Sequence, residues 1–305
     1  MKVKLLTWAA ITAMMLSTQV AYAGWYEDAD AAYKRGDYAS VLTLVRPLAE
    51  QGDAKGENFL GGLYAKGQAV PLDYAEAIKW YRKSADQGNA TGQYNLGLVY
   101  ANGQGAPQDY AEALKWFHKS ADQGNSDAQC ALGTSYTNGN GVPQDYAEAI
   151  KWFRKAADHG NAYGQFNLFK IYYVGNGWPS DYVEAIKWDR KAADQGLPEA
   201  QVSLGDAYEK GKGVPQDYVE AAKWYRKGAD QGDSWGQEFL GFLYMDGRGV
   251  SKDLIQAYMW LNLSAVNGRP EVVKPRDDTA GLMTQEQLAE AQRLTREWSY
   301  AHAKK

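Results

Sequence analysis

The residues best suited to chemistry in this 305-residue chain are paired carboxylates, three histidines and a single cysteine. Asp73 and Glu76 stand three residues apart, a spacing that general acid–base catalysis could use. The same pair returns at every 36th residue. It recurs as Asp109/Glu112, Asp145/Glu148, Asp181/Glu184 and Asp217/Glu220. Catalysis needs one such pair, whereas every helix start needs a cap, so the pattern predicts that each pair forms a capping box.

The remaining reactive residues form no catalytic or metal-binding pattern. The three histidines are far apart in sequence, and no second cysteine can join Cys130 in a metal site. Cys130 shares its place in the 36-residue period with Tyr94 and Val202, which predicts a small buried apolar residue. The glycine-rich stretch 103–105 follows no predicted strand and precedes no lysine-serine pair, so it is not a phosphate loop. We expect no metal, no cofactor and no enzyme, although residues from separate loops could still assemble a site.

The elements that position these residues are set by the internal repeat. Trp80, for example, returns in phase at every 36th residue, without insertion or deletion. The full series is Trp80, Trp116, Trp152, Trp188, Trp224 and Trp260. A fixed period between 20 and 50 residues is typical of stacked supersecondary units. The sequence therefore predicts a stack of 36-residue units.

Each unit contains two predicted helices. The second helix runs from Asp73 to Gln87 and the first from about Ala90 to Tyr100, each with apolar residues at helical spacing. Gly97 recurs inside every first helix except one, where Phe169 replaces it. Because glycine destabilises a helix by roughly 1 kcal/mol relative to alanine, its return predicts a close contact between helices.

These residues resemble a known repeat family. The string LGxxYxxGxGVPxDYxxAxxWYxxAAxxG, clearest at Leu132–Gly160 and Leu204–Gly232, is similar to the Sel-one-like repeat (SLR), a relative of the tetratricopeptide repeat. The resemblance implies an all-α fold, a right-handed α/α superhelical solenoid of stacked 36-residue helix-turn-helix repeats. It also implies a concave binding face and, often, an exported bacterial adaptor. Cysteine-rich relatives linked to β-lactam binding carry paired cysteines in each repeat, which this chain lacks.

The repeat divides the chain into four expected segments. Residues 1–23 are predicted to be a signal peptide and residues 24–52 a degenerate N-terminal repeat and cap. Residues 53–268 hold six Sel-one-like repeats by that resemblance. Residues 269–305 are predicted to contain an irregular segment, Arg269 to Leu282, followed by a capping helix that begins with Thr284 and covers the last repeat.

The start of the chain predicts export. Lys2 and Lys4 precede the short apolar run Leu5–Leu16, and Ala21-Tyr22-Ala23 forms a small-x-small cleavage site. We therefore expect a mature protein that begins at Gly24, is periplasmic or secreted, and does not insert into the membrane.

Without Lys2 and Lys4, 31 basic residues remain against 37 acidic ones, a net charge of −6. That charge argues against a nucleic-acid partner and against an anionic lipid surface.

The positions that vary between repeats have two interpretations: a binding surface, or neutral drift on a solvated face. In the first helix, four varying positions lie on one face, because they are spaced by four, three and four residues. From these positions we select five partner-binding candidates, Tyr163, Asn167, Lys170, Asp206 and Trp235. The expected function is a scaffold in the cell envelope that binds a protein or peptide on the concave face. The alternatives are a cell-envelope hydrolase or β-lactam-binding enzyme of the cysteine-rich repeat type, and a purely structural envelope protein. The sequence predicts neither the partner nor the oligomeric state.

Overall fold

The computed structural model describes residues 24–175 and 180–302, and within these ranges the chain forms helices and no strand. The predicted all-α class is therefore confirmed. The expected signal peptide, residues 1–23, lies outside the described residues. The chain divides between Pro143 and Gln144 into two compact units, which are taken in turn.

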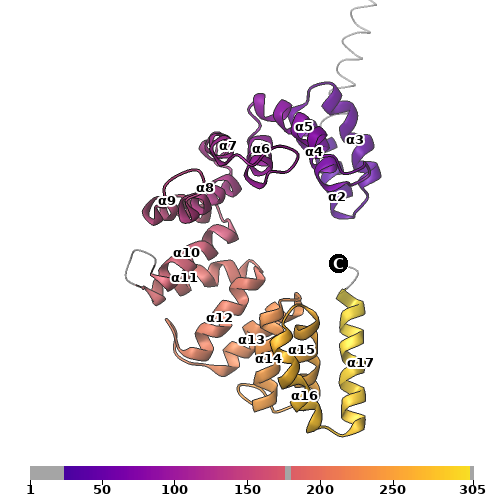
Figure 1. The fold of residues 1–305 in the computed structure, drawn as a ribbon, viewed down its shortest axis with the longest axis vertical. Helices are drawn as coiled ribbons and strands as arrows, with labels where there is room; N and C mark the ends of the chain where they lie inside the picture. The colour runs from indigo at the N-terminus through magenta and orange to yellow at the C-terminus, as the bar shows by residue number, and fades with distance from the viewer. Residues whose placement is uncertain (1–23, 176–179, 303–305) are drawn as a thin grey trace, which may run out of the picture. The chain divides into compact units, whose positions relative to one another are not determined.

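The first unit consists of seven described helices, each of which packs against the next along the chain (Figure 1). They are α2 (Trp25–Lys34), α3 (Tyr38–Glu50), α4 (Ala54–Lys66), α5 (Tyr74–Asp86), α6 (Ala90–Asn102), α7 (Tyr110–Asp122) and α8 (Ser126–Asn138). The α4 helix packs against α5, and α6 against α7. Each pair is the predicted unit of one first and one second helix.

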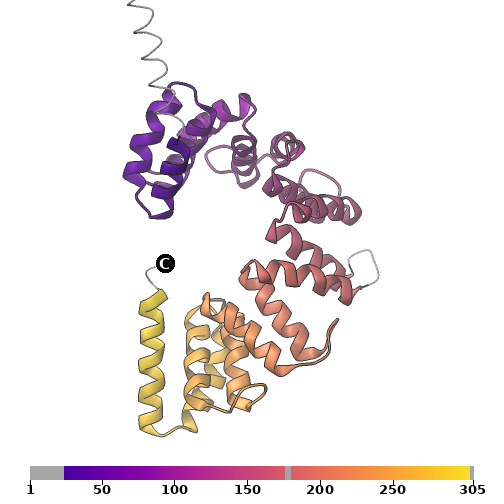
Figure 2. The same cartoon turned by 180° about the vertical axis from the view of Figure 1, so that it is seen from behind.

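The second unit continues this pattern and adds a different ending (Figure 2). Its repeat helices are α9 (Tyr146–Asp158), α10 (Ala162–Val174), α11 (Tyr182–Asp194), α12 (Pro198–Lys210), α13 (Tyr218–Asp230), α14 (Ser234–Asp246) and α15 (Leu254–Val266). The ending is the 3-10 turn η1 (Pro270–Val272), α16 (Val273–Gly281) and α17 (Gln285–His302).

The prediction that Arg269 to Leu282 is irregular is wrong, because most of this segment forms η1 and α16. Pro270 and Pro275 lie in the first turns of these two elements, where the missing proline N–H costs no helical hydrogen bond. The capping box of the last helix is confirmed. The Thr284 N–H donates to Gln287 Oε1 at 2.9 Å, and the Gln287 N–H donates to Thr284 Oγ1 at 3.2 Å. As expected, α17 covers the last repeat by packing against α15.

The predicted capping boxes of the second helices form only in half. Asp73 accepts the N–H of Glu76 at 3.0 Å, as expected of a helix cap. Glu76 does not reach back, because the N–H of Asp73 already donates to the carbonyl of Tyr64 at 3.0 Å. The Glu76 carboxylate instead pairs with Lys79 at 2.5 Å. These acids are therefore structural, as the sequence predicted, although the glutamates act on the following turn.

The recurring glycines lie where two helices touch, as predicted. A Cβ atom placed on Gly97 would come within 2.6 Å of the Phe117 ring, and one on Gly205 within 2.6 Å of the Tyr225 ring. Only glycine leaves room for these rings between the paired helices.

Cys130 differs from its prediction: it was expected to be fully buried, and it is half-buried.

A ladder of side-chain amides connects successive repeats, and the sequence analysis did not anticipate it. Gln201 shows the pattern: its Nε2 donates to the carbonyl of Ala193 at 3.2 Å, and its Oε1 accepts from Gln231 Nε2 at 2.8 Å. Gln201 is buried, and equivalent bonds recur 36 residues apart. The same kind of amide pair joins Gln123 to Gln93, Gln195 to Gln165 and Asn267 to Gln237. In α6, α10, α12 and α14 the buried glutamine ties the first helix to both adjacent second helices, satisfying buried polar groups within the stack.

Candidate functional site

Three first helices of the second unit, α10, α12 and α14, line a cavity of about 550 Å³, which we call the first-helix cavity. Its apolar lining consists of Phe166, Phe169, Tyr173, Val202, Trp235 and Phe239. Its polar lining consists of Lys170, Glu199, Ser203, Asp206 and Asp233. Concave sites with an aromatic lining and a few polar groups are the usual form of binding pockets in proteins.

The aromatic wall arises from an exchange of residues between paired helices. In α10, Phe169 takes the position that Gly205 has in α12, and in α11 Asp189 takes the position that Tyr225 has in α13. The ring therefore projects from the first helix instead of the second. Phe169 packs on Phe166 and Tyr173, with ring centroids 5.5 and 5.1 Å away. The exchange compensates volume within the pair and also places an aromatic ring in the cavity.

Asp189 is fully buried behind this cavity. Its Oδ2 accepts a hydrogen bond from Ser203 Oγ at 2.6 Å, and Ser203 lines the cavity. Its Oδ1 has no hydrogen-bond partner in the described part of the chain. Burial raises the pKa of the Asp189 carboxyl from 3.8 to about 8, although the Ser203 hydrogen bond and the Arg190 charge lower it. A carboxyl group that is mostly protonated at neutral pH therefore lies next to the lining residue Ser203 but outside the cavity lining itself.

The charged lining residues differ in how they are paired. Asp206 forms an ion pair with Lys210 at 2.6 Å. Asp233 caps α14 by accepting the Gly236 N–H at 2.8 Å. The ammonium of Lys170 lies 4.7 Å from the centroid of the Phe166 ring. Lys170 and Glu199 are both exposed, and neither forms an ion pair within residues 24–175 and 180–302.

The structure brings together three of the five residues that the sequence selected. Lys170, Asp206 and Trp235 line the first-helix cavity from three different helices. Tyr163 lies on the first turn of α10, outside the lining, and is 59% exposed. Asn167 is half-buried on the same helix and does not line the cavity.

Sequence reasoning missed several lining residues because it assigned their positions to stacking. Phe166 and Val202 share a position with Cys130, which we read as core, yet both face the cavity. Phe239 was not among the five selected residues, yet it lines the cavity, and the last helix α17 packs on α15. The available signal was Phe169, where an aromatic residue replaces the recurring glycine.

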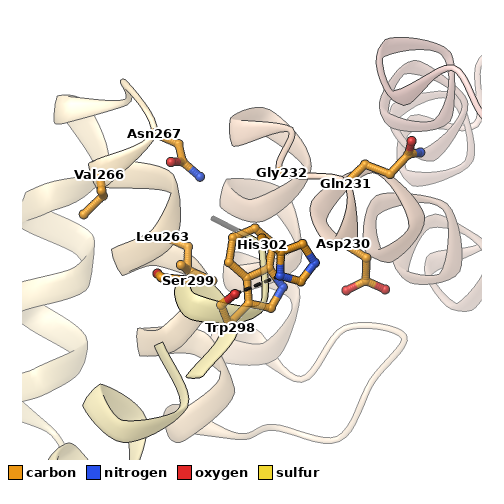
Figure 3. Close-up of a pocket in the computed structure, with 9 residues that line it drawn as sticks. All are labelled: Asp230, Gln231, Gly232, Leu263, Val266, Asn267, Trp298, Ser299 and His302. Atoms are coloured by element: carbon orange, nitrogen blue, oxygen red, sulfur yellow. Dashed lines mark hydrogen bonds between the residues drawn. The ribbon is translucent and has the colours of Figure 1, made fainter. Parts of the chain in front are cut away.

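A second cavity, of about 580 Å³, lies between α17 and the last repeat (Figure 3). Three of its polar side chains, those of Gln231, Asn267 and His302, serve the fold. Asn267 and Gln231 belong to the amide ladder, with donor–acceptor distances of 3.0 and 2.8 Å. The ring of His302 stacks on Trp298 with centroids 3.8 Å apart, and its Nδ1 lies 2.8 Å from the Trp298 carbonyl oxygen. This cavity therefore belongs to the end cap.

We also searched the described residues for a metal site and for a membrane-spanning helix. Within residues 24–175 and 180–302, no group of three or more His, Cys, Asp or Glu side chains is arranged to hold a metal ion. No helix in these ranges has both the length and the apolar character needed to cross a bilayer. The arrangement of the first-helix cavity suits non-covalent binding.

Comparison with known proteins identifies similar repeats and folds. The family model described as Sel1 repeat matches six segments of the chain. They are residues 54–89, 90–125, 126–161, 162–197, 198–233 and 236–268. No curated protein matches the chain.

Among the solved structures that resemble the chain, two have the following similarity. One is a protective antigen present in uropathogenic Escherichia coli strains, displaying an SLR fold; it is 35% identical with a TM-score of 0.78, over 90% of this chain and 60% of that protein. This chain therefore spans less than two thirds of that antigen. The other is a Sel1 repeat protein from Oxalobacter formigenes, 32% identical with a TM-score of 0.68, over 79% of this chain and 97% of that protein.

Proposed function

Because the chain belongs to the Sel1 repeat family, whose members are repeat scaffolds that commonly bind other proteins, we propose that it binds a protein or peptide through its first helices. The resemblance of the repeats implies that this face is the concave one. The protein would act as an exported adaptor or assembly factor of the cell envelope. Scaffolds of this family are generally non-catalytic, and we propose a binding function without catalysis for this chain as well.

The observation that supports this proposal best is the aromatic lining of the first-helix cavity. Stacking uses rings packed against glycine, such as Tyr225 on Gly205, but it does not require Trp235 or Phe239. Trp235 is 48% exposed, with its ring centroid 5.7 Å from that of Phe239. Large aromatic side chains in partly enclosed sites contribute most of the free energy in many protein interfaces. Trp235 and Phe239 on α14 and Tyr163 on α10 together provide a surface suited to an extended peptide.

We expect that Tyr163→Ala combined with Trp235→Ala strongly weakens capture of the native partner from an envelope extract. Truncation of an interface hot spot typically costs about 2 kcal/mol or more, roughly thirtyfold in affinity. The measurement is affinity capture with mass spectrometry, accompanied by circular dichroism to verify the fold. The controls are Tyr300→Ala and Val219→Ala, at residues that are 74% and 51% exposed elsewhere on the chain. Loss of capture by the controls but not by the double variant would place the binding surface elsewhere.

Export is tested separately. The basic start, apolar run and cleavage site at Ala21-Tyr22-Ala23 lead us to expect Gly24 as the first residue of the periplasmic or secreted protein. The measurement is N-terminal sequencing of the protein recovered from the periplasmic or secreted fraction. A soluble cytoplasmic protein that retains Met1 would contradict the export proposal and leave the binding proposal intact.

A further inference from the structure

The two ends of the first-helix cavity differ in charge. Glu199 is the second residue of α12, and Asp233 is the cap of α14, so both lie at helix starts beside Trp235. Lys170 is the ninth residue of α10. Lys170 therefore stands seven positions further along its helix than Glu199 does along α12. Because seven helical residues span about 10 Å, Lys170 lies well away from the two acids along the helix direction. We call the region of Glu199, Asp233 and Trp235 the helix-start end.

Neither acid of the helix-start end is required for stacking. Asp233 caps its helix, but Asn89, Asn125 and Asn161 cap the equivalent helices without a charge. Glu199 is exposed and takes the position that Trp235 has in the next repeat. Both negative charges are therefore additional to what the fold needs.

The two acids are also close enough to interact unfavourably. Burial raises the pKa of the Asp233 carboxyl, and the N–H groups of Gly236 and Trp235 lower it. The charge of Glu199 raises this pKa further, whereas the charge of Arg269 lowers it. A second cation placed between the two carboxylates would relieve their repulsion and would be attracted to both.

Trp235 already binds one cation of the protein itself. The guanidinium carbon of Arg269 lies 3.1 Å from the centroid of a Trp235 ring, and Arg269 is held there by Glu238 at 2.6 Å. Cations are attracted to the faces of aromatic rings, most strongly to tryptophan. Because Trp235 remains 48% exposed despite this contact, part of its surface is open to another group.

We propose that the helix-start end binds an arginine side chain of the partner peptide, with the guanidinium between Glu199, Asp233 and Trp235. This assignment rests on the proposed peptide-binding function and specifies what the peptide must present. The aliphatic stem of the arginine packs on Phe239 and Val202, as stems of long cationic side chains do on apolar surfaces. Arginine fits better than lysine, because a planar guanidinium can both stack on a ring and pair with two carboxylates.

The test uses the purified protein and short capped peptides, acetyl-Gly-X-Gly-amide. X is arginine, citrulline, leucine or glutamate, and citrulline has nearly the shape of arginine without its charge. Binding is followed by NMR at the indole N–H of Trp235, assigned with Trp235→Phe. We expect the arginine peptide to bind at least about fivefold more tightly than the citrulline peptide, because the charge carries the recognition.

Matched variants locate the effect. Glu199→Gln with Asp233→Asn should weaken the arginine peptide about tenfold, while the asparagine still caps α14 as it does in other repeats. The control, Asp158→Asn with Asp194→Asn, makes the same change in net charge at exposed residues outside the cavity and should leave affinity nearly unchanged.

Three results would overturn the assignment. Equal binding of the citrulline or leucine peptide would make the cavity a receptor for uncharged side chains. Tighter binding of the glutamate peptide would move recognition to Lys170. Absence of any shift with the arginine peptide would also overturn it. In each case, capture of the native partner that still depends on Tyr163 and Trp235 would show that the peptide-binding function stands.

Discussion

The folded protein is expected to lose stability as the pH rises from about 4 to about 8, and Asp189→Asn is expected to remove much of that loss. The pKa of Asp189 is about 8 in the folded protein and ordinarily 3.8. Between these values the folded state keeps the proton that the unfolded chain releases. Raising the pH therefore favours unfolding, by about 1.4 kcal/mol per pH unit from this group. Above about pH 8 both states are ionised and the loss stops.

The measurement is denaturant unfolding at several pH values between 4 and 8, followed by circular dichroism. Asp189→Asn removes the titrating group and retains an oxygen that can accept the Ser203 hydroxyl. Asp194→Asn, at an exposed position five residues further along the same helix, is the matched control and should follow the parent. Parallel pH profiles for the parent and Asp189→Asn would mean that the buried carboxyl does not titrate as its environment implies.

Two adjacent glycines of α4 are expected to respond in opposite directions to the same substitution. A Cβ atom at Gly61 would lie 2.7 Å from the ring of Tyr81, whereas one at Gly62 would meet only the Tyr81 hydroxyl, at 3.7 Å. Tyr81 is 6% exposed and packed in the core, so its ring cannot easily move away. Gly61→Ala should destabilise by about 1 to 3 kcal/mol through overpacking. Gly62→Ala should stabilise by up to about 1 kcal/mol, because alanine favours the helix.

The measurement is the melting temperature of Gly61→Ala and Gly62→Ala in thermal unfolding. Both variants gain the same helix propensity, so the difference between their melting temperatures reports the contact with Tyr81. A similar shift of the melting temperature in both would show that the recurring glycine does not mark a close contact. Because stacked repeats are stabilised mainly by their nearest neighbours, the effect is expected to concentrate in the helices that contact α4.

The fold could be read from the sequence because stacking repeats the same physical requirements in every unit. Gly97 and its equivalents return in phase, and the structure explains Gly61, Gly97 and Gly205 by an aromatic ring on the facing helix and Gly241 by the Leu261 side chain. The role of Glu76 could not be read in this way. Its expected bond to the N–H of Asp73 depends on whether that N–H is free, and the carbonyl of Tyr64 occupies it. The partner of a backbone group on another helix is not visible in a local motif.

The cavity was predictable only in part, for a related reason. Comparing repeats identified Lys170, Asp206 and Trp235 as positions not needed for stacking, and all three line the cavity. Phe166 escaped notice, because its position is shared with residues read as core. Whether such a residue faces the core or a groove depends on the helices 36 residues before and after it. The amide ladder was missed because an exposed glutamine such as Gln231 reads as a surface residue until its partner Gln201 is seen.

The most direct test of the central claim, that the first helices bind the partner, is site-specific photocrosslinking in cells. Tyr163 or Trp235 is replaced by benzoylphenylalanine, with Tyr300 replaced in the same way as the control, because it is 74% exposed on α17. Upon irradiation, positions 163 and 235 are expected to form a covalent adduct with the same polypeptide, and position 300 is expected to form none. An adduct formed from position 300, with none from positions 163 and 235, would contradict the central claim.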